Sequence, residues 1–255
     1  LLVDAWQRCQ GPLAGPVHLN LPFRDPLPPS EPEKGFRSPP GLQVETFLSL
    51  PPAGQIQPTL SPTVLVSLLP RTDRGVIVIG PHAFTEREEA AAAVRELSLL
   101  TGWPVLADGA GTLRGDLASS GRLVGAYDLI LRDARQAKAL LPKAAILLGP
   151  LPTSKVLRSW LRGADPLTLQ VGRPGENTDA THGRWTRLDG VLTPSGAKPA
   201  DRPNPTLQAW RRAEAKARRR LEQALAVDAP FEGRVIPALE NALGPEDRLF
   251  VGSSM

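Results

Sequence analysis

Several residue types are scarce in this 255-residue chain, and each scarcity excludes a class of structure. The single cysteine, Cys9, rules out an internal disulfide framework and fits a reducing compartment, so we expect a cytoplasmic protein. The three histidines, His18, His82 and His182, lie far apart in the sequence, and none has the spacing of a metal-ligand pair. Structural zinc is therefore not expected.

Long hydrophobic runs are also lacking. No segment approaches the roughly 18 apolar residues that a membrane helix requires, and the first residues, LLVDAWQRCQ, do not follow the signal-peptide pattern. We therefore expect no membrane span and no export. The only methionine is the last residue, Met255. This pattern is expected of a piece trimmed from a longer protein.

Aromatic residues make up only 5% of the chain, although its net charge of +4 could suggest nucleic acid as a partner. Much of the positive charge lies in the segment 210–220, WRRAEAKARRR. There Trp210, Ala213, Ala217 and Leu221 recur at spacings of three and four, which indicates an amphipathic helix with its arginines in solvent. Because aromatic side chains for base stacking are almost absent among the arginines, we expect no nucleic-acid partner.

Proline, by contrast, is abundant, with 28 residues against a usual share of roughly 5%. Many prolines lie between Pro26 and Pro62, and they predict an extended linker because proline disfavours helices and central strands. Before this linker, residues 3–10 resemble the end of a helix, and GPVHLNLPF (15–23) predicts a buried strand. One helix and one strand cannot bury their own apolar faces, so they need a sheet to join.

From residue 74 onwards, strand and helix patterns alternate. Short apolar runs predict four strands, at 75–80, 103–109, 144–149 and 166–172. Helical spacing predicts helices at 85–100, 127–141 and 153–162, the first of them opened by a Thr85–Glu88 capping box. This alternation predicts an α/β fold with a doubly wound parallel sheet.

The remaining segments predict irregular structure followed by a new α/β unit. Residues 173–205 are rich in Gly, Pro, Thr and Asp and predict no regular element. A long helix over 205–226, a second helix in FEGRVIPALENAL and a terminal strand in RLFVG come after them. The chain thus carries partial α/β segments on both sides of its central sheet.

The best candidate for a ligand site is LLGPLPTSKVLRSW (147–160), because ligands of open α/β sheets bind where strands end and helices begin. Thr153 or Ser154 can cap the helix, and Lys155 falls in its first turn beside free backbone N–H groups. This arrangement suits a carboxylate or phosphate. The alternative is a lysine that merely faces solvent.

Several familiar motifs are missing. The segment from Gly149 to Lys155 imitates a phosphate-binding loop but lacks its second glycine and its magnesium-binding hydroxyl. The glycines of VIVIGPHAFTE and ADGAGTLRG do not follow the dinucleotide fingerprint, so nicotinamide and flavin are weakly supported. A nucleophile elbow is absent, and VGSSM has no histidine nearby. From the residues alone, the prediction is an α/β domain with a helix N-terminus suited to anions.

Three segments carry a resemblance to a known family. GPVHLNLPFRDPL (15–27), LLGPLPTSKVLRSWL (147–161) and LFVGSSM (249–255) resemble the 2-succinyl-5-enolpyruvyl-6-hydroxy-3-cyclohexene-1-carboxylate synthases, abbreviated SEPHCHC synthases. The N-x-P-F-R-x-P-L pattern is the most selective of the matches. The resemblance spans the whole chain and implies the central domain of a thiamin diphosphate enzyme of menaquinone biosynthesis.

The resemblance also implies a domain division. Residues 1–27 would end a pyrimidine-binding domain, and 28–62 would be the linker. Residues 63–200 would form the central domain, and 201–255 would begin a pyrophosphate-binding domain. The parent enzyme would be a cytoplasmic homodimer or homotetramer.

In that family, thiamin diphosphate and a metal, Mg²⁺ or manganese, support the joining of decarboxylated 2-oxoglutarate to isochorismate with release of CO₂. The resemblance assigns substrate binding to Lys155 and Ser254, whereas Val156 stands where some members have arginine. It places the thiamin-activating glutamate and the Gly-Asp-Gly metal motif in domains outside this chain. We therefore expect the chain by itself to bind no cofactor and to be inactive.

Two alternatives remain open at this stage. The parent could be another thiamin diphosphate decarboxylase or carboligase, such as a relative of acetolactate synthase, although NLPFRDPL argues against that. The central domain could also be a non-catalytic scaffold or a regulatory ligand site. Assays with pyruvate would test the first alternative, and thermal-shift measurements with candidate ligands would test the second.

Overall fold

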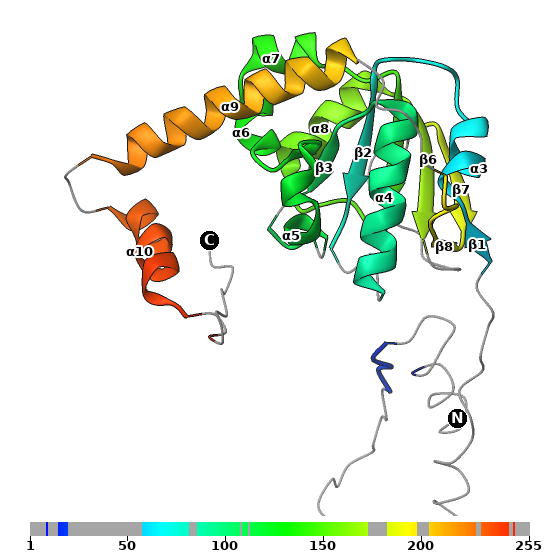
Figure 1. Ribbon diagram of the computed structural model, residues 1–255, viewed down its shortest axis with the longest axis horizontal. Coiled ribbons are helices and arrows are strands. Elements are labelled where there is room, and N and C mark those ends of the chain that lie inside the picture. The colour runs from blue at the N-terminus through cyan, green and yellow to red at the C-terminus, as the bar shows by residue number, and fades with distance from the viewer. Residues whose placement is uncertain are drawn as a thin grey trace, which may run out of the picture.

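The computed structural model describes residues 9, 15–19, 58–81, 86–107, 109–111, 113–172, 183–197, 204–227, 231–244 and 247. At its centre lies a six-stranded parallel sheet with the strand order β4-β3-β2-β5-β6-β7 (Figure 1). The strands are β2 (Gly75–Ile79), β3 (Val105–Ala107), β4 (Leu123–Val124), β5 (Ala144–Leu148), β6 (Leu167–Gly172) and β7 (Trp185–Asp189).

The strand order confirms the predicted doubly wound sheet. Counted along the chain within this sheet, the order is 3-2-1-4-5-6, the arrangement of two mononucleotide-binding halves placed side by side. The winding direction reverses between the neighbouring strands β2 and β5, which pair in parallel from Gly75 with Ala144 to Ile79 with Leu148. In such sheets the carboxyl ends of the two strands at the reversal are the usual place for a ligand.

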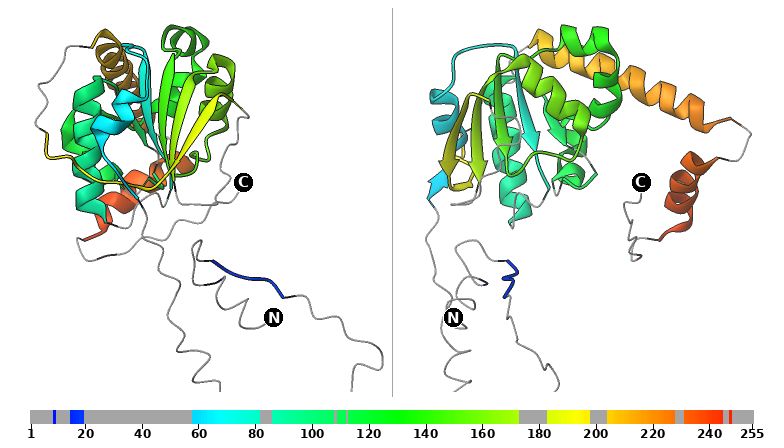
Figure 2. Two further views of the ribbon diagram at one scale, coloured as in Figure 1. Left: turned by 90° about the vertical axis from the view of Figure 1, so that its right-hand side faces the viewer. Right: turned by 180° about the vertical axis from the view of Figure 1, so that it is seen from behind.

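Both faces of the sheet are covered by helices (Figure 2). The helices are α3 (Pro62–Ser67), α4 (Arg87–Thr101), α5 (Arg114–Leu117), α6 (Tyr127–Arg132), α7 (Ala134–Ala139), α8 (Lys155–Ala164), α9 (Pro205–Leu225) and α10 (Val235–Ala242). Two short 3₁₀ helices, Ala118–Ser120 and Glu232–Arg234, complete the helical segments.

The continuous apolar runs explain the central strands. Every residue of β2 and β5 is buried, as expected for parallel strands that are covered on both faces. Alternate residues face opposite sides: Ile77 packs in one core cluster with α3 and α4, and Val76 in another with α6, α8 and α9. The predicted strands 75–80, 144–149 and 166–172 are thus confirmed within one residue at each end, whereas the strand predicted at 103–109 is limited to β3.

The prediction of irregular structure over 173–205 is wrong for residues 185–189 and 191–192. Residues 185–189 form β7, and Val191–Leu192 form β8, which pairs in parallel with β1 (Thr59–Leu60) at the end of the predicted linker. The strand β4 was not predicted either. These strands are short or lie at an edge, and no residue of β7 is fully buried, so they lack the apolar run that marks a central strand.

The helix predicted over 127–141 is two helices. Asp133 has an extended backbone (φ −80°, ψ 111°), and its side chain accepts hydrogen bonds from the backbone N–H groups of Arg135 and Gln136. It therefore ends α6 and caps α7. The sequence did not predict this break, because an aspartate within a run of helical spacing caps a helix only where the local backbone is extended.

Other boundaries differ in detail. The helix α4 begins at Arg87 after Glu86, which makes no side-chain capping bond. Thr85 lies outside the described residues, so the predicted Thr85–Glu88 capping box stays a prediction. Residues 15–19 have no regular secondary structure and are mostly exposed, so the predicted buried strand is wrong there, and no described strand pairs with them. The predicted strand RLFVG (248–252) lies outside the described residues.

The two helices predicted near the end of the chain are confirmed as α9 and α10. Asn204 caps α9, since its side chain accepts from the N–H groups of Thr206 and Leu207. The first half of α9 packs on the sheet domain, and its second half extends away towards α10 (Figure 1). Among the residues that the structure describes, no helix is long and apolar enough to cross a membrane.

Candidate functional site

The loop after β5 lies directly against the end of β2, at the point where the winding reverses. The backbone N–H of Gly80 donates to the carbonyl oxygen of Leu148 over 2.9 Å, and that of Gly149 donates to Val171 over 2.8 Å. An ideal Cβ on Gly80 would lie 1.6 Å from the carbonyl oxygen of Pro150. Only a glycine allows this approach, and the approach fixes the path of the chain into α8.

Ser154 caps the helix α8, as the sequence predicted for Thr153 or Ser154. Its hydroxyl oxygen accepts a hydrogen bond from the backbone N–H of Leu157 over 3.1 Å. Thr153 is exposed and makes no such bond. The first residue of α8 is therefore Lys155.

Asp128 of α6 contacts the same helix end and was not singled out by the sequence. The Ser154 hydroxyl donates to its Oδ1 over 2.6 Å, and Nε of Arg132 donates to its Oδ2 over 2.8 Å. The helix N-terminus is thus less open to an incoming anion than predicted, because Ser154 takes one N–H group and Asp128 brings a carboxylate close to the others. Positive charge at the first position of α8 comes from Lys155.

The pKa of Asp128 reflects these contacts. Partial burial raises the pKa, but the hydrogen bonds from Ser154 and Arg132 and the charge of Arg132 together lower it below its ordinary value. The carboxylate form therefore prevails well into the acidic range.

This lowered pKa predicts a pH-dependent contribution to stability. A depressed folded-state pKa gives stability that is complete above the unfolded-state value, roughly 3.9, and is lost as the pH falls through the folded-state value. We expect Asp128→Asn to lower the free energy of unfolding by about 0.5–1 kcal/mol at pH 7, since the pair with Arg132 is partly exposed. Urea unfolding of both proteins from pH 7 to pH 3 checks this: the difference should shrink below about pH 4, and a difference that grows with acidification would contradict it.

Lys155 meets the requirements of an anion-binding side chain. It is exposed, and within the described part of the chain it makes no hydrogen bond or ion pair. Its neighbour Val156 is half-buried and packs against the core cluster of α6, α8 and α9, so it offers no second polar contact. Ser254 lies outside the described residues, and the structure does not bring it together with Lys155.

The helix α9 is held to the sheet domain by a second carboxylate that sequence reasoning missed. Glu214, nearly buried, accepts from the backbone N–H groups of Gly125 (3.3 Å) and Ala126 (2.9 Å) and from Nε of Arg218 (2.8 Å). Ala126 precedes α6 and has no side-chain cap of its own. Glu214 therefore supplies the N-terminal cap of α6 from another helix.

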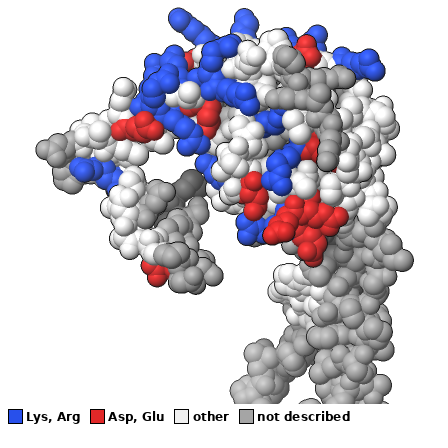
Figure 3. All heavy atoms as spheres, in the orientation of Figure 1, with Lys and Arg blue, Asp and Glu red and all other residues white. Residues whose placement is uncertain are grey.

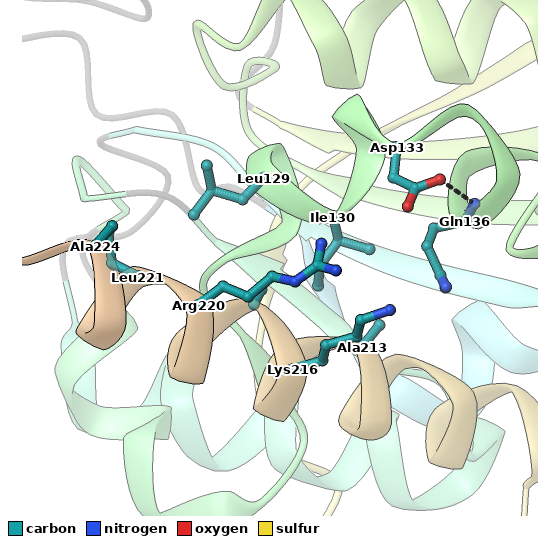
Figure 4. A pocket seen from close by; sticks show the side chains of 10 residues that line it. Leu129, Ile130, Asp133, Gln136, Ala213, Lys216, Arg220, Leu221 and Ala224 are labelled. Atoms are coloured by element: carbon teal, nitrogen blue, oxygen red, sulfur yellow. Dashed lines mark hydrogen bonds between the residues drawn. The ribbon is translucent and has the colours of Figure 1, made fainter.

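A groove of about 320 Å³ runs between α6 and α9 (Figure 4). Its apolar lining includes Leu129 and Leu221, which are 47% and 45% exposed. Lys216 and Arg220 of α9 also line it (Figure 4). Lys and Arg side chains gather along this helix on the face shown in Figure 3. The predicted amphipathic character of this segment is confirmed, because its basic residues from Arg211 to Arg220 are exposed.

The described residues offer no site for the implied metal. Across the ranges that the structure describes, no three His, Cys, Asp or Glu side chains gather so as to hold an ion. The loops after β2 and β5 likewise carry no glycine fingerprint for a diphosphate.

Comparisons with known proteins agree with the fold. The family model described as the middle domain of thiamine pyrophosphate matches residues 64–251. A 2-succinyl-5-enolpyruvyl-6-hydroxy-3-cyclohexene-1-carboxylate synthase from Thermosynechococcus vestitus is 38% identical, with 100% of this chain and 44% of the relative covered. Synthases of the same name from a Synechococcus species and from Trichormus variabilis are 36% and 32% identical, each over 100% of this chain and 45% of the relative.

The chain thus spans a little under half the length of these curated relatives. The family match covers all six strands of the central sheet and all the helices from α3 to α10, except for Pro62 and Thr63 at the start of α3. The resemblance found in the sequence is confirmed, and the chain belongs to the thiamine pyrophosphate middle-domain family.

Proposed function

We propose that this chain is the central part of a SEPHCHC synthase, which joins decarboxylated 2-oxoglutarate to isochorismate and releases CO₂. The observation that carries the proposal is the identity of 32–38% to synthases of this name along the entire chain. An exposed lysine at the helix that follows the central strand β5 suits a reaction in which both substrates are carboxylates.

The proposed domain division follows from the same assignment. Residues 1–27 end a pyrimidine-binding domain, 28–62 form the linker, 63–200 the central domain and 201–255 the start of a pyrophosphate-binding domain. The helix α9 lies within the fourth segment, but its buried residues Leu207, Trp210 and Ala213 are all in its first half, which packs on the central domain, whereas its second half is mostly exposed. This helix would connect the two domains mechanically.

The cofactor and the assembly belong to the parent protein in this proposal. Thiamin diphosphate supplies the carbanion chemistry when bound, together with Mg²⁺, and in this proposal both are held by parts of the parent protein other than this chain. The parent is a cytoplasmic transferase of menaquinone biosynthesis that forms a homodimer or homotetramer. The role of this chain is to bind and orient an acidic substrate through Lys155, with Ser254 as a second substrate contact.

The proposal predicts a binding defect when Lys155 is replaced. In the full-length enzyme, Lys155→Ala should raise the KM for a carboxylate substrate about 10- to 100-fold, because a hydrogen bond between charged groups contributes roughly 1.5–3 kcal/mol. Steady-state kinetics with each substrate varied in turn measures this.

The matched control is Lys143→Ala. Lys143 is an exposed lysine that directly precedes β5, so it lies at the amino ends of the strands, whereas Lys155 follows their carboxyl ends. Its replacement should leave both KM values unchanged. Unchanged kinetics in Lys155→Ala would remove Lys155 from the site. Turnover of pyruvate alone by the full-length enzyme would instead favour a different thiamin diphosphate carboligase.

A further inference from the structure

We propose that Asp128 is a positioning residue for Lys155 and acts through Ser154, and that Glu214 holds the helix that carries Asp128. The inference rests on the proposed function, because it gives a purpose to the lysine assigned there. It is drawn from three hydrogen-bonded links: the Ser154 hydroxyl between α6 and the first turn of α8, the contacts of Asp128 and Glu214 that hold α6, and the bond that ties α8 to α7.

The first link is the hydroxyl group of Ser154. A serine hydroxyl has one hydrogen to donate and lone pairs that accept. Its hydrogen goes to Asp128 at 2.6 Å, so that a lone pair is directed at the N–H of Leu157 at 3.1 Å. The Asp128 carboxylate therefore selects the hydroxyl orientation in which Ser154 caps α8. Without that carboxylate, the hydroxyl can rotate and the cap weakens.

The second link fixes Asp128 itself. One of its oxygens is held by Arg132, one turn later in α6, and the N-terminus of α6 is held by Glu214. The helix α6 has no capping side chain of its own, so its first turn depends on the carboxylate that α9 supplies. Displacing Glu214 would loosen the turn that contains Asp128.

The third link explains why Lys155 depends on these contacts. The middle of α8 is tied to α7 by the indole N–H of Trp160, which donates to the carbonyl oxygen of Ala137 over 2.8 Å. The first turn of α8 has the Ser154–Asp128 contact in the corresponding role. Lys155 is the first residue of the helix, and no described side chain holds its ammonium group. The region that the ammonium group can reach is therefore set by the backbone at Ser154.

The test uses the full-length enzyme and a double-mutant cycle. Asp128→Ala and Ser154→Ala should each raise the KM for the carboxylate substrate of Lys155 roughly five-fold, the size of a lost helix cap, with kcat nearly unchanged. Combined with Lys155→Ala, neither should add a further increase in KM, because they act through that lysine. Ser154→Thr, which keeps the hydroxyl, should restore most of the wild-type KM.

Asp133→Ala is the matched control. Asp133 also caps a helix, α7, but it does not contact the first turn of α8, so its replacement should leave the KM unchanged. Hydrogen–deuterium exchange gives a readout that is independent of turnover: the amide of Leu157 should exchange faster in Asp128→Ala and in Glu214→Gln than in the wild type.

The outcomes separate this inference from the proposed function. If Lys155→Ala raises the KM and Asp128→Ala does not, the positioning role is overturned and the proposed function stands. Additive increases in KM for Asp128→Ala and Lys155→Ala would also overturn the positioning role. If Lys155→Ala itself leaves the KM unchanged, the assigned role of Lys155 fails, and the positioning role fails with it.

Discussion

Replacing Trp210 by alanine should lower the free energy of unfolding by about 3–5 kcal/mol. Trp210 is completely buried and is the largest fully buried side chain among the described residues. It packs edge-to-face on Trp160 of α8, with ring centroids 5.7 Å apart and an interplanar angle of 87°. Its removal leaves a cavity between α8 and α9 that the helices can fill only in part, and it removes an aromatic pair that contributes about 0.5–1.5 kcal/mol.

Two companion variants make this prediction specific. Trp210→Phe should cost less, because the indole N–H is buried without a hydrogen-bond partner among the described residues and its loss breaks no bond. Leu221→Ala, on the exposed part of the same helix, should change the stability by less than about 0.5 kcal/mol. Urea unfolding followed by far-ultraviolet circular dichroism measures all three. A cost for Trp210→Ala no larger than that for Leu221→Ala would show that α9 does not dock on the sheet domain.

Gly80→Ala should lower the free energy of unfolding by about 3 kcal/mol, at the upper end of the range for overpacking. The new Cβ would meet a backbone atom, the carbonyl oxygen of Pro150, at 1.6 Å, and no side-chain rotation relieves that contact. The end of β2 and the loop after β5 have to separate, which breaks the bond from Gly80 to Leu148. Because this loop leads into α8, the variant should also weaken substrate binding at Lys155.

The matched control is Gly163→Ala. Gly163 lies in α8, and a Cβ added there meets nothing within 4 Å. Alanine should therefore stabilise the helix by up to about 1 kcal/mol, because it restricts the unfolded chain and favours helix. Thermal unfolding of the two variants side by side should shift the midpoint in opposite directions. If Gly80→Ala unfolds at the wild-type temperature, that result would contradict the close contact between Gly80 and the carbonyl oxygen of Pro150.

The central part of the fold could be predicted because burial on both faces leaves a direct trace in the sequence. The runs GVIVI and AAILL are apolar throughout, and their alternation with amphipathic helices is compatible with few topologies. The edge strands left no such trace. In β7, Thr186 and Asp189 are exposed and the other residues only half-buried, so the strand depends on pairing with β6, a contact that local pattern does not record.

The candidate site could be predicted only as far as local spacing reaches. The cap at Ser154 and the position of Lys155 depend on a few consecutive residues, and both were found. Asp128 lies 26 positions before Ser154, and Glu214 lies 88 positions after Ala126. Because their partners lie so far away in the sequence, local pattern predicts both carboxylates to be ordinary surface residues. Their partners are brought close only when α6 packs against α8 and α9. The resemblance to the synthases supplied the reaction, which the residues alone did not.

In the proposed function, this chain orients an acidic substrate in a SEPHCHC synthase. The most direct measurement is an assay of the full-length enzyme, with thiamin diphosphate and Mg²⁺, on 2-oxoglutarate and isochorismate, with the wild type and Lys155→Ala compared under the same conditions. The wild type should form SEPHCHC and CO₂, and the variant should have a KM for one carboxylate substrate that is about 10- to 100-fold higher. Absence of the condensation product from the wild type, or equal KM values in the two proteins, would contradict the proposed function.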